Sequence, residues 1–156
     1  MPETDWDTVM NINLKSVYRT IKAVLPHMLA RKSGSVINMS STQAFRSWAN
    51  WTAYATAKGG MIAMTNQLAG QFGEHNIRFN TISPGAILTP MNEKRAEVEG
   101  GAFLESSINQ HAIKRMGTPL EVSMTAVFLA SDESTFITGE DIKVDGGLCT
   151  LPRYFD

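Results

Sequence analysis

The chain has 156 residues, of which 43% are hydrophobic and 19% are charged, and its formal net charge at pH 7 is −1. These values favour one globular domain and exclude a disordered chain. The 14 basic and 15 acidic residues form no basic block, so nucleic acid is not an expected partner. No stretch has the apolar length of a membrane helix. The single cysteine, Cys149, fits a reducing, cytoplasmic location and is expected to be an inert thiol.

The first half of the chain alternates between helical and strand patterns. Apolar residues at helical spacing predict a helix over 5–30, with Thr4 as its N-cap and Pro26 loosening its last turn. A short buried strand is predicted over 34–40. After a loop, a long helix is predicted over 52–73, so this half has the order helix, strand, helix.

The second half continues the same alternation. A strand is predicted over 77–83 and is closed by a Ser-Pro-Gly turn. The segment 91–117 is charged and interrupted by glycines, so its pattern is weak. A helix with proline in its first turn is predicted over 119–131, followed by a strand over 141–145 and a tail over 148–156.

This alternation predicts parallel strands joined by crossover helices, which is the α/β class. A doubly wound parallel sheet carries helices on both faces. Three strands are few for such a sheet. The pattern therefore predicts that the chain is part of a larger α/β domain.

Two polar side chains at helical spacing form the first candidate site. Tyr54 and Lys58 are four residues apart, so on a helix they share one face. A tyrosine has an ordinary pKa near 10, and a neighbouring ammonium lowers it, which makes the phenol a usable acid or base. The alternative for this pair is a packed ring beside a solvated amine.

A hydroxyl follows the predicted strand 34–40, at the end where α/β sheets bind ligands. Ser41 could donate a hydrogen bond to a carbonyl oxygen, and Ser40 points the opposite way on an extended chain. Either serine could instead be a helix cap or a turn residue. Trp48 and Trp51 could equally wall a pocket or be plain packing residues.

The histidines show no spacing typical of metal ligands, so no metal site is expected. His27, His75 and His111 are expected in surface or packing positions.

Five sequence motifs, in order along the chain, resemble landmarks of the short-chain dehydrogenase/reductase family. They extend over nearly the whole chain, from Trp6 to Gly147. The motifs are Trp6-Asp7 with Asn13, Asn38-Met39-Ser40-Ser41, Tyr54-x-x-x-Lys58, Ser83-Pro84-Gly85-x-Ile87-x-Thr89-Pro90, and Thr138-Gly139 with Val144-Asp145-Gly146-Gly147.

The resemblance implies a catalytic tetrad. Tyr54 would exchange a proton with the substrate oxygen, and Lys58 would lower the pKa of Tyr54 and bind the nicotinamide ribose. Ser41 would polarise the substrate oxygen, with Ser40 as the second choice. Asn13 would hold a water that links Lys58 to solvent.

The resemblance also implies NAD or NADP as cofactor and an alcohol or ketone as substrate. Tyr54 and Lys58 would touch the nicotinamide end of the cofactor, and Pro84, Gly85, Ile87 and Thr89 would border the ring. The segment 91–117 would form a substrate lid, but lids of this kind vary too freely to name a substrate.

The glycine-rich turn that seats the cofactor pyrophosphate in this family has no counterpart in the sequence. The resemblance therefore implies strands five to seven of seven, with Met1 either an internal methionine or the start of a genuinely truncated gene. We expect no turnover from these 156 residues alone. The alternative function is a non-catalytic relative that serves as an assembly or regulatory subunit.

The predicted helix 52–73 carries no charge from Gly59 to Gly73. A helix on a sheet usually has a charged outer stripe, so this one is expected to be covered by another subunit. Together with the resemblance, this predicts a homodimer or homotetramer formed through the helices 5–30 and 52–73. Replacing Met64 or Leu68 with lysine is expected to dissociate the dimer if those side chains face out.

Overall fold

The computed structural model describes residues 1–150, so residues 151–156 of the predicted tail lie outside the described residues. The described chain contains, in order, α1 (Glu3–Met10), a π-helical segment (Asn11–Lys15), α2 (Ser16–Arg31), β1 (Gly34–Met39), α3 (Thr52–Phe72), β2 (Ile77–Pro84), α4 (Pro90–Glu99), α5 (Gly101–Asn109), α6 (Pro119–Ala130) and β3 (Asp141–Val144).

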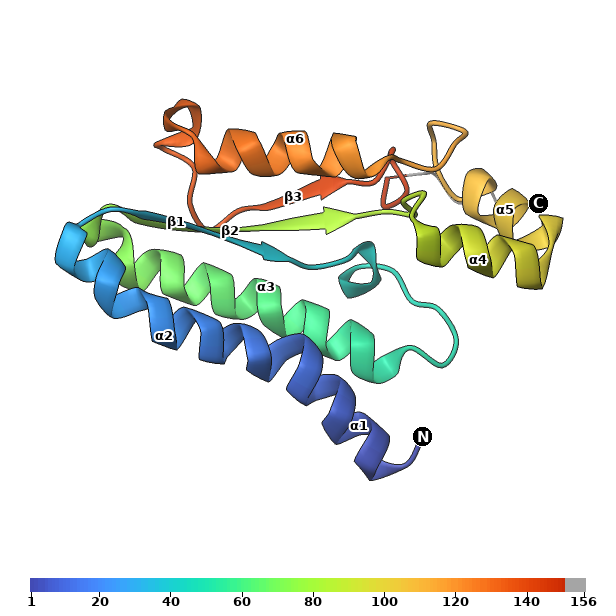
Figure 1. The fold of residues 1–156 in the computed structure, drawn as a ribbon, viewed down its shortest axis with the longest axis horizontal. Helices are drawn as coiled ribbons and strands as arrows, with labels where there is room; N and C mark the ends of the chain where they lie inside the picture. Colours follow the sequence, from blue (N-terminus) through green and yellow to red (C-terminus); the bar gives the residue numbers. More distant parts are fainter. Residues whose placement is uncertain (151–156) are drawn as a thin grey trace.

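The three strands form one parallel sheet in the order β1-β2-β3. Helices α2 and α3 lie on one face of the sheet and α6 lies on the other (Figure 1). The predicted α/β class with parallel strands and crossover helices is therefore confirmed.

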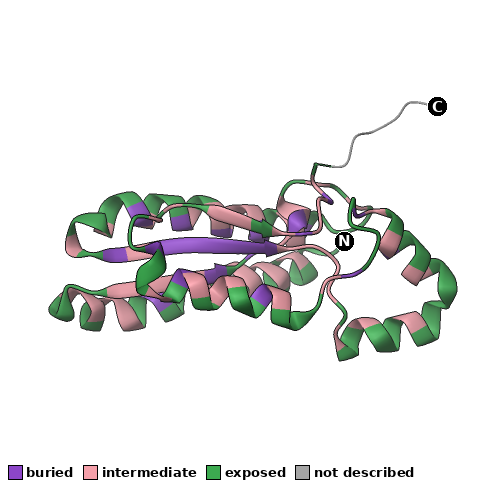
Figure 2. Ribbon diagram, turned by 90° about the horizontal axis from the view of Figure 1, so that it is seen from above, coloured by how far each residue is buried: buried purple, intermediate pink, exposed green. Residues whose placement is uncertain are grey.

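Strand β2 is shared by two hydrophobic cores. On one side Ile77 and Phe79 pack with residues of α2 and α3 such as Ile21. On the other side Ile82 packs with residues of α6 such as Leu129. Figure 2 shows burial concentrated along this central strand. Because parallel strands end at the same edge, these cores fix where the loops after β1 and β2 meet.

The first helix differs from its prediction. It begins at Glu3, and Pro2 occupies the N-cap position without a side-chain hydrogen bond, so Thr4 does not cap it. A π-helical turn then interrupts the regular helix at Asn11–Lys15. The helix continues through Pro26 and ends at Arg31, and the C-cap residue Lys32 has a left-handed backbone with φ of 51°.

The segment 91–117 contains two helices where the sequence pattern is weak. Thr89 accepts a hydrogen bond from the Asn92 N–H, and Pro90 stands in the first turn, so α4 has both usual start signals. Its sequence is rich in charged residues and none of its side chains is buried, which explains the weak pattern. Gly100, with φ of 73°, separates α4 from α5.

Strand β1 forms an edge of the described sheet, since it pairs with β2 alone among the described strands. A groove runs between this strand and α2, with Val17, Ile21 and Val24 of the helix and Val36 of the strand among its lining residues. Across residues 1–150, the helices are too short or too polar to cross a bilayer.

Candidate active site

A cavity of about 610 Å³ lies at the carboxyl ends of the strands, between the loop after β1, the start of α3, and the segment after β2. Five of the eight predicted site residues line it. They are Ser41, Tyr54, Gly85, Ile87 and Thr89. The structure therefore brings together residues that are up to 48 positions apart in sequence.

Tyr54 lies in the first turn of α3, where its ring makes an edge-to-face contact with Trp51 at 5.4 Å between centroids. Burial raises the pKa of the phenol, while the Ser41 hydroxyl, as a hydrogen-bond partner, lowers it to a smaller extent. Tyr54 is therefore a protonated group at neutral pH, with a second hydroxyl beside it.

Lys58 lies one helical turn further along α3 and is only 9% exposed. Its Nζ donates a hydrogen bond of 2.8 Å to the Met39 carbonyl and stands 5.4 Å from the centroid of the Tyr54 ring. Burial lowers the pKa of this ammonium. The lowered pKa predicted for Tyr54 is not found in this structure, because burial outweighs the other influences on the phenol.

The two serines after β1 have different partners. The Ser40 hydroxyl is 3% exposed and donates to the Lys58 carbonyl at 3.0 Å. The Ser41 hydroxyl lines the cavity and accepts a hydrogen bond from the Gln43 N–H. Successive side chains of an extended chain point in opposite directions, so Ser41 faces the cavity. The Ser40 hydroxyl instead links the end of β1 to α3.

Asn13 lies in the π-helical segment and not on the cavity wall. Its amide nitrogen donates to the Val9 carbonyl at 3.0 Å. The next residue, Leu14, packs against Gly60 of α3, where a Cβ would come within 3.1 Å of the leucine Cδ2. The π turn therefore sits beside the helix that carries Lys58, and π turns are common at functional sites.

The loop after β2 is held through its main chain. The Gly85 N–H donates to the Val144 carbonyl at 3.0 Å, the Ala86 carbonyl accepts from the Gly117 N–H at 2.9 Å, and the Leu88 N–H donates to the Gly117 carbonyl at 2.8 Å. The Pro84 carbonyl accepts from the Thr42 hydroxyl at 3.2 Å. These bonds fix the loop that carries four of the predicted site residues.

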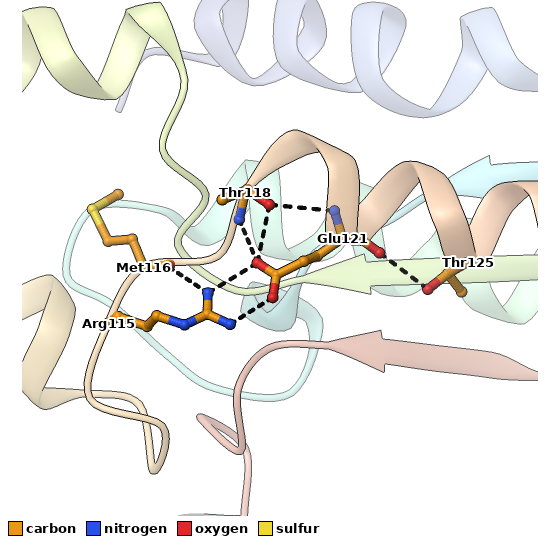
Figure 3. Close-up of polar contacts among 5 residues, drawn as sticks. All are labelled: Arg115, Met116, Thr118, Glu121 and Thr125. Atoms are coloured by element: carbon orange, nitrogen blue, oxygen red, sulfur yellow. Dashed lines mark hydrogen bonds and ion pairs between the residues drawn. The ribbon is translucent and has the colours of Figure 1, made fainter.

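An ion pair supports the segment that contains Gly117 (Figure 3). The Arg115 guanidinium makes two hydrogen bonds to the Glu121 carboxylate, which also accepts from the Thr118 N–H and hydroxyl. These hydrogen bonds, that of Arg115 first, hold the pKa of Glu121 at about 2. The Thr118 hydroxyl accepts in return from the Glu121 N–H and caps α6.

Sequence reasoning missed several polar residues of the cavity wall. Gln43, Asn92, Gln110 and His111 line it, and the Gln43 side-chain oxygen is buried without a hydrogen-bond partner among the described residues. The Gln110 oxygen accepts from the Trp48 indole N–H at 3.1 Å. No sequence motif marks these four residues, because they come from separate segments that only the fold brings together.

Trp48 and Trp51, in the loop before α3, both line the cavity, and Trp51 also packs against Tyr54. Cys149 lies outside the cavity wall. Burial first, and then the neighbouring Asp145, raise the pKa of its thiol to about 11. The thiol is therefore protonated at neutral pH, as the sequence predicts.

The family model described as enoyl-(acyl carrier protein) reductase matches residues 1–149. Among curated proteins, the chain is 41% identical over 148 residues to a 3-oxoacyl-[acyl-carrier-protein] reductase of Thermotoga maritima, covering 95% of this chain and 58% of the relative. It is 43% identical over 149 residues to dehydrogenase/reductase SDR family member 6 of Danio rerio, covering 93% and 60%.

Solved structures give the same result. A gluconate 5-dehydrogenase from Burkholderia cenocepacia, in complex with NADP and tartrate, superimposes with a TM-score of 0.91 at 32% identity. The alignment covers 97% of this chain and 59% of that one. The chain belongs to the short-chain dehydrogenase/reductase family, and it spans about three fifths of the length of these relatives.

Proposed function

We propose that the chain carries the catalytic residues of an NAD(P)-dependent oxidoreductase that interconverts an alcohol and a carbonyl compound. The observation that supports this most directly is the cavity wall on which the Tyr54 phenol and the Ser41 hydroxyl stand together, with Lys58 behind the tyrosine ring. Structural neighbours that were solved with NADP or NAD bound support the class of cofactor.

The proposed roles follow from the states of these groups. The raised pKa of Tyr54 keeps its proton at neutral pH, which suits a general acid that protonates a carbonyl oxygen during reduction. Ser41 would hold the same oxygen by a hydrogen bond. In oxidation Tyr54 would take the proton back from the alcohol. The nicotinamide, when bound, supplies or accepts the hydride.

The residues present fit the nicotinamide end of the cofactor. An ammonium has three donors, and Lys58 uses one of them on the Met39 carbonyl, which leaves donors for ribose hydroxyls. Gly85, Ile87 and Thr89 line the cavity that Tyr54 also lines, and with Pro84, which precedes them on the same loop, they would border the ring. Asn13, in the adjoining π turn, would hold the water that relays protons from Lys58.

The three strands would be strands five to seven of a seven-stranded sheet. Two observations support this assignment: β1 has an open edge with an apolar groove beside it, and the chain spans only 58–60% of its curated relatives. An additional strand would pair along that edge and cover the groove.

A chimera tests the proposed function. The N-terminal segment of the Thermotoga maritima relative that this chain does not match would be joined in front of Met1. We expect oxidation of NADPH or NADH with one of a panel of carbonyl substrates, followed by nicotinamide absorbance. A chimera that melts cooperatively but transfers no hydride to any of them, with either cofactor, contradicts the proposal.

The 156-residue chain alone should bind NADH and NADPH without saturation in the micromolar range. Each hydrogen bond to a charged pyrophosphate contributes roughly 1.5–3 kcal/mol, so the loss of several weakens binding by orders of magnitude. Nicotinamide fluorescence during titration measures this. Saturable micromolar binding would show that the cofactor site is more complete than we propose.

A second candidate function is a non-catalytic assembly or regulatory subunit. Mixing the purified chain with a full-length family member, and measuring complex formation and the activity of that partner, separates the two functions.

We also propose that α3 forms part of a contact between copies of the chain, in a homodimer or homotetramer. Met64 and Leu68 are partly buried and pack against the core that α2, α3 and β2 share, so they are not the outward-facing positions of the helix. The exposed positions of α3 are instead uncharged, and Ala63 lies among them. Ala63→Lys should dissociate the assembly in sedimentation, whereas Ser123→Lys on α6 should not. A wild-type chimera that sediments as a monomer would contradict this contact.

A further inference from the structure

His111 is a buried side chain that joins two segments of the cavity wall. It is 2% exposed and follows the end of α5. Its Nε2 accepts a hydrogen bond of 3.1 Å from the Ala86 N–H. Its Nδ1 lies 2.6 Å from the carbonyl oxygen of Ser107, in the last turns of α5.

These two partners fix the protonation state of the ring. A backbone carbonyl can only accept, so Nδ1 must carry a proton to bond Ser107. A backbone N–H can only donate, so Nε2 must be unprotonated to bond Ala86. Only the neutral imidazole with its proton on Nδ1 satisfies both contacts.

The space around the ring is equally restricted. A Cβ at Gly85 would come within 2.7 Å of His111 Nε2 and within 3.0 Å of the Asp145 Cα. A Cβ at Gly146 would come within 3.4 Å of His111 Cδ2. The ring is thus seated between two glycines, one in the loop after β2 and one after β3.

We infer that His111 is a positioning residue, which locks the loop Gly85–Leu88 to α5. This inference rests on the proposed function, in which that loop borders the nicotinamide and α5 belongs to the segment over the substrate. Gly117 holds the same loop from its other side through the Ala86 carbonyl and the Leu88 N–H. His111 therefore makes the position of the cofactor-facing loop depend on the position of α5.

Two substitutions separate the two hydrogen bonds of the ring. Asparagine places its amide near the Nδ1 position, so His111→Asn keeps a donor for Ser107 and removes the acceptor for Ala86. Glutamine reaches toward the Nε2 position, so His111→Gln keeps the acceptor for Ala86. His75, at the opposite end of β2, supplies the control His75→Asn.

Amide hydrogen exchange of the 156-residue chain measures the hydrogen bond between the Ala86 N–H and His111 without requiring any catalysis. We expect the Ala86 amide to exchange faster by at least about tenfold in His111→Asn and to remain near wild type in His111→Gln and His75→Asn. The Gly85 amide, bound to the Val144 carbonyl, should stay protected in all of them and serves as the internal reference. Equal Ala86 exchange in wild type and His111→Asn overturns the inference.

The NMR chemical shifts of the His111 ring nitrogens in the wild-type chain give a second measurement, which does not depend on whether a variant folds. We expect the tautomer with its proton on Nδ1 and a free Nε2, and a ring with its proton on Nε2 would overturn the inference.

In the chimera, His111→Asn should raise KM for the cofactor on the order of tenfold with kcat little changed, and His111→Gln should restore it. Identical constants for the two variants contradict a positioning role. An inactive wild-type chimera counts against the proposed function alone. The exchange experiment on the 156-residue chain still tests whether His111 holds the loop Gly85–Leu88.

Discussion

The two walls of the cavity are held in place by different means. Ser41 and Tyr54 belong to a wall formed by the end of β1 and the start of α3, whose spacing follows from strand alternation and helical pitch. The other wall, which extends from Gly85 to His111, depends on hydrogen bonds between segments far apart in sequence, including those that Gly117 makes to the loop after β2. The first wall carries the hydroxyl groups that we propose to act on the substrate oxygen, and the second fixes a loop by its main chain.

Removing the Tyr54 hydroxyl should have the largest effect and should act on the first wall alone. In the chimera, Tyr54→Phe should lower kcat by about 10²–10⁴-fold, because the proton donor is lost while the ring contact with Trp51 remains. The melting temperature should stay close to that of wild type. Retention of more than a tenth of the activity would show that another group supplies the proton.

Substitution of Gly85 should damage the second wall. In Gly85→Ala, the new Cβ would meet His111 Nε2 and the Asp145 backbone, with a cost of roughly 1–3 kcal/mol in the free energy of unfolding. Gly59→Ala is the matched control, since nothing lies within 4 Å of its Cβ position on α3. There we expect stabilisation of up to about 1 kcal/mol. Urea unfolding of both variants tests the difference, and equal stabilities would contradict it.

The Arg115–Glu121 pair should give the smallest effect, because both side chains are exposed to solvent. The pKa of Glu121 is lowered from 4.5 to about 2, so its contribution is present above pH 4.5 and is lost as the pH falls toward 2. The melting temperatures of wild type and Glu121→Gln should differ at pH 7 and converge near pH 2. A difference in melting temperature between the two proteins that grows as the pH falls would contradict the stabilising role of the Glu121 carboxylate.

The first wall was largely predictable because its signals are local. The four-residue spacing of Tyr54 and Lys58 implies a shared helix face, and the alternation of Ser40 and Ser41 on an extended chain implies that only one of them faces the cavity. The direction of the Tyr54 pKa was not predictable, since it depends on how deeply the folded chain buries the phenol.

The second wall gave little signal in the sequence. His111 bonds to main-chain atoms of Ala86 and Ser107, and every residue type offers those atoms. Helix α4 is rich in charged residues and buries none of its side chains, so it has no apolar stripe to mark it in the sequence. The π turn at Asn13 likewise has no residue pattern that marks it.

The loop Gly85–Leu88 is held to His111 and Gly117 by its main-chain atoms, which matters for laboratory evolution of the substrate range. Ala86 bonds to His111 through its N–H and to Gly117 through its carbonyl, and Leu88 bonds to Gly117 through its N–H. The side chains of Ala86 and Leu88 take no part in these hydrogen bonds. Ala86 lines the cavity and Leu88 is 42% exposed. A library that randomises these two codons should diversify the cavity wall at Ala86 and the neighbouring surface at Leu88 while the loop keeps its place. Proline is the residue to leave out of that library, because it lacks the N–H that each position donates.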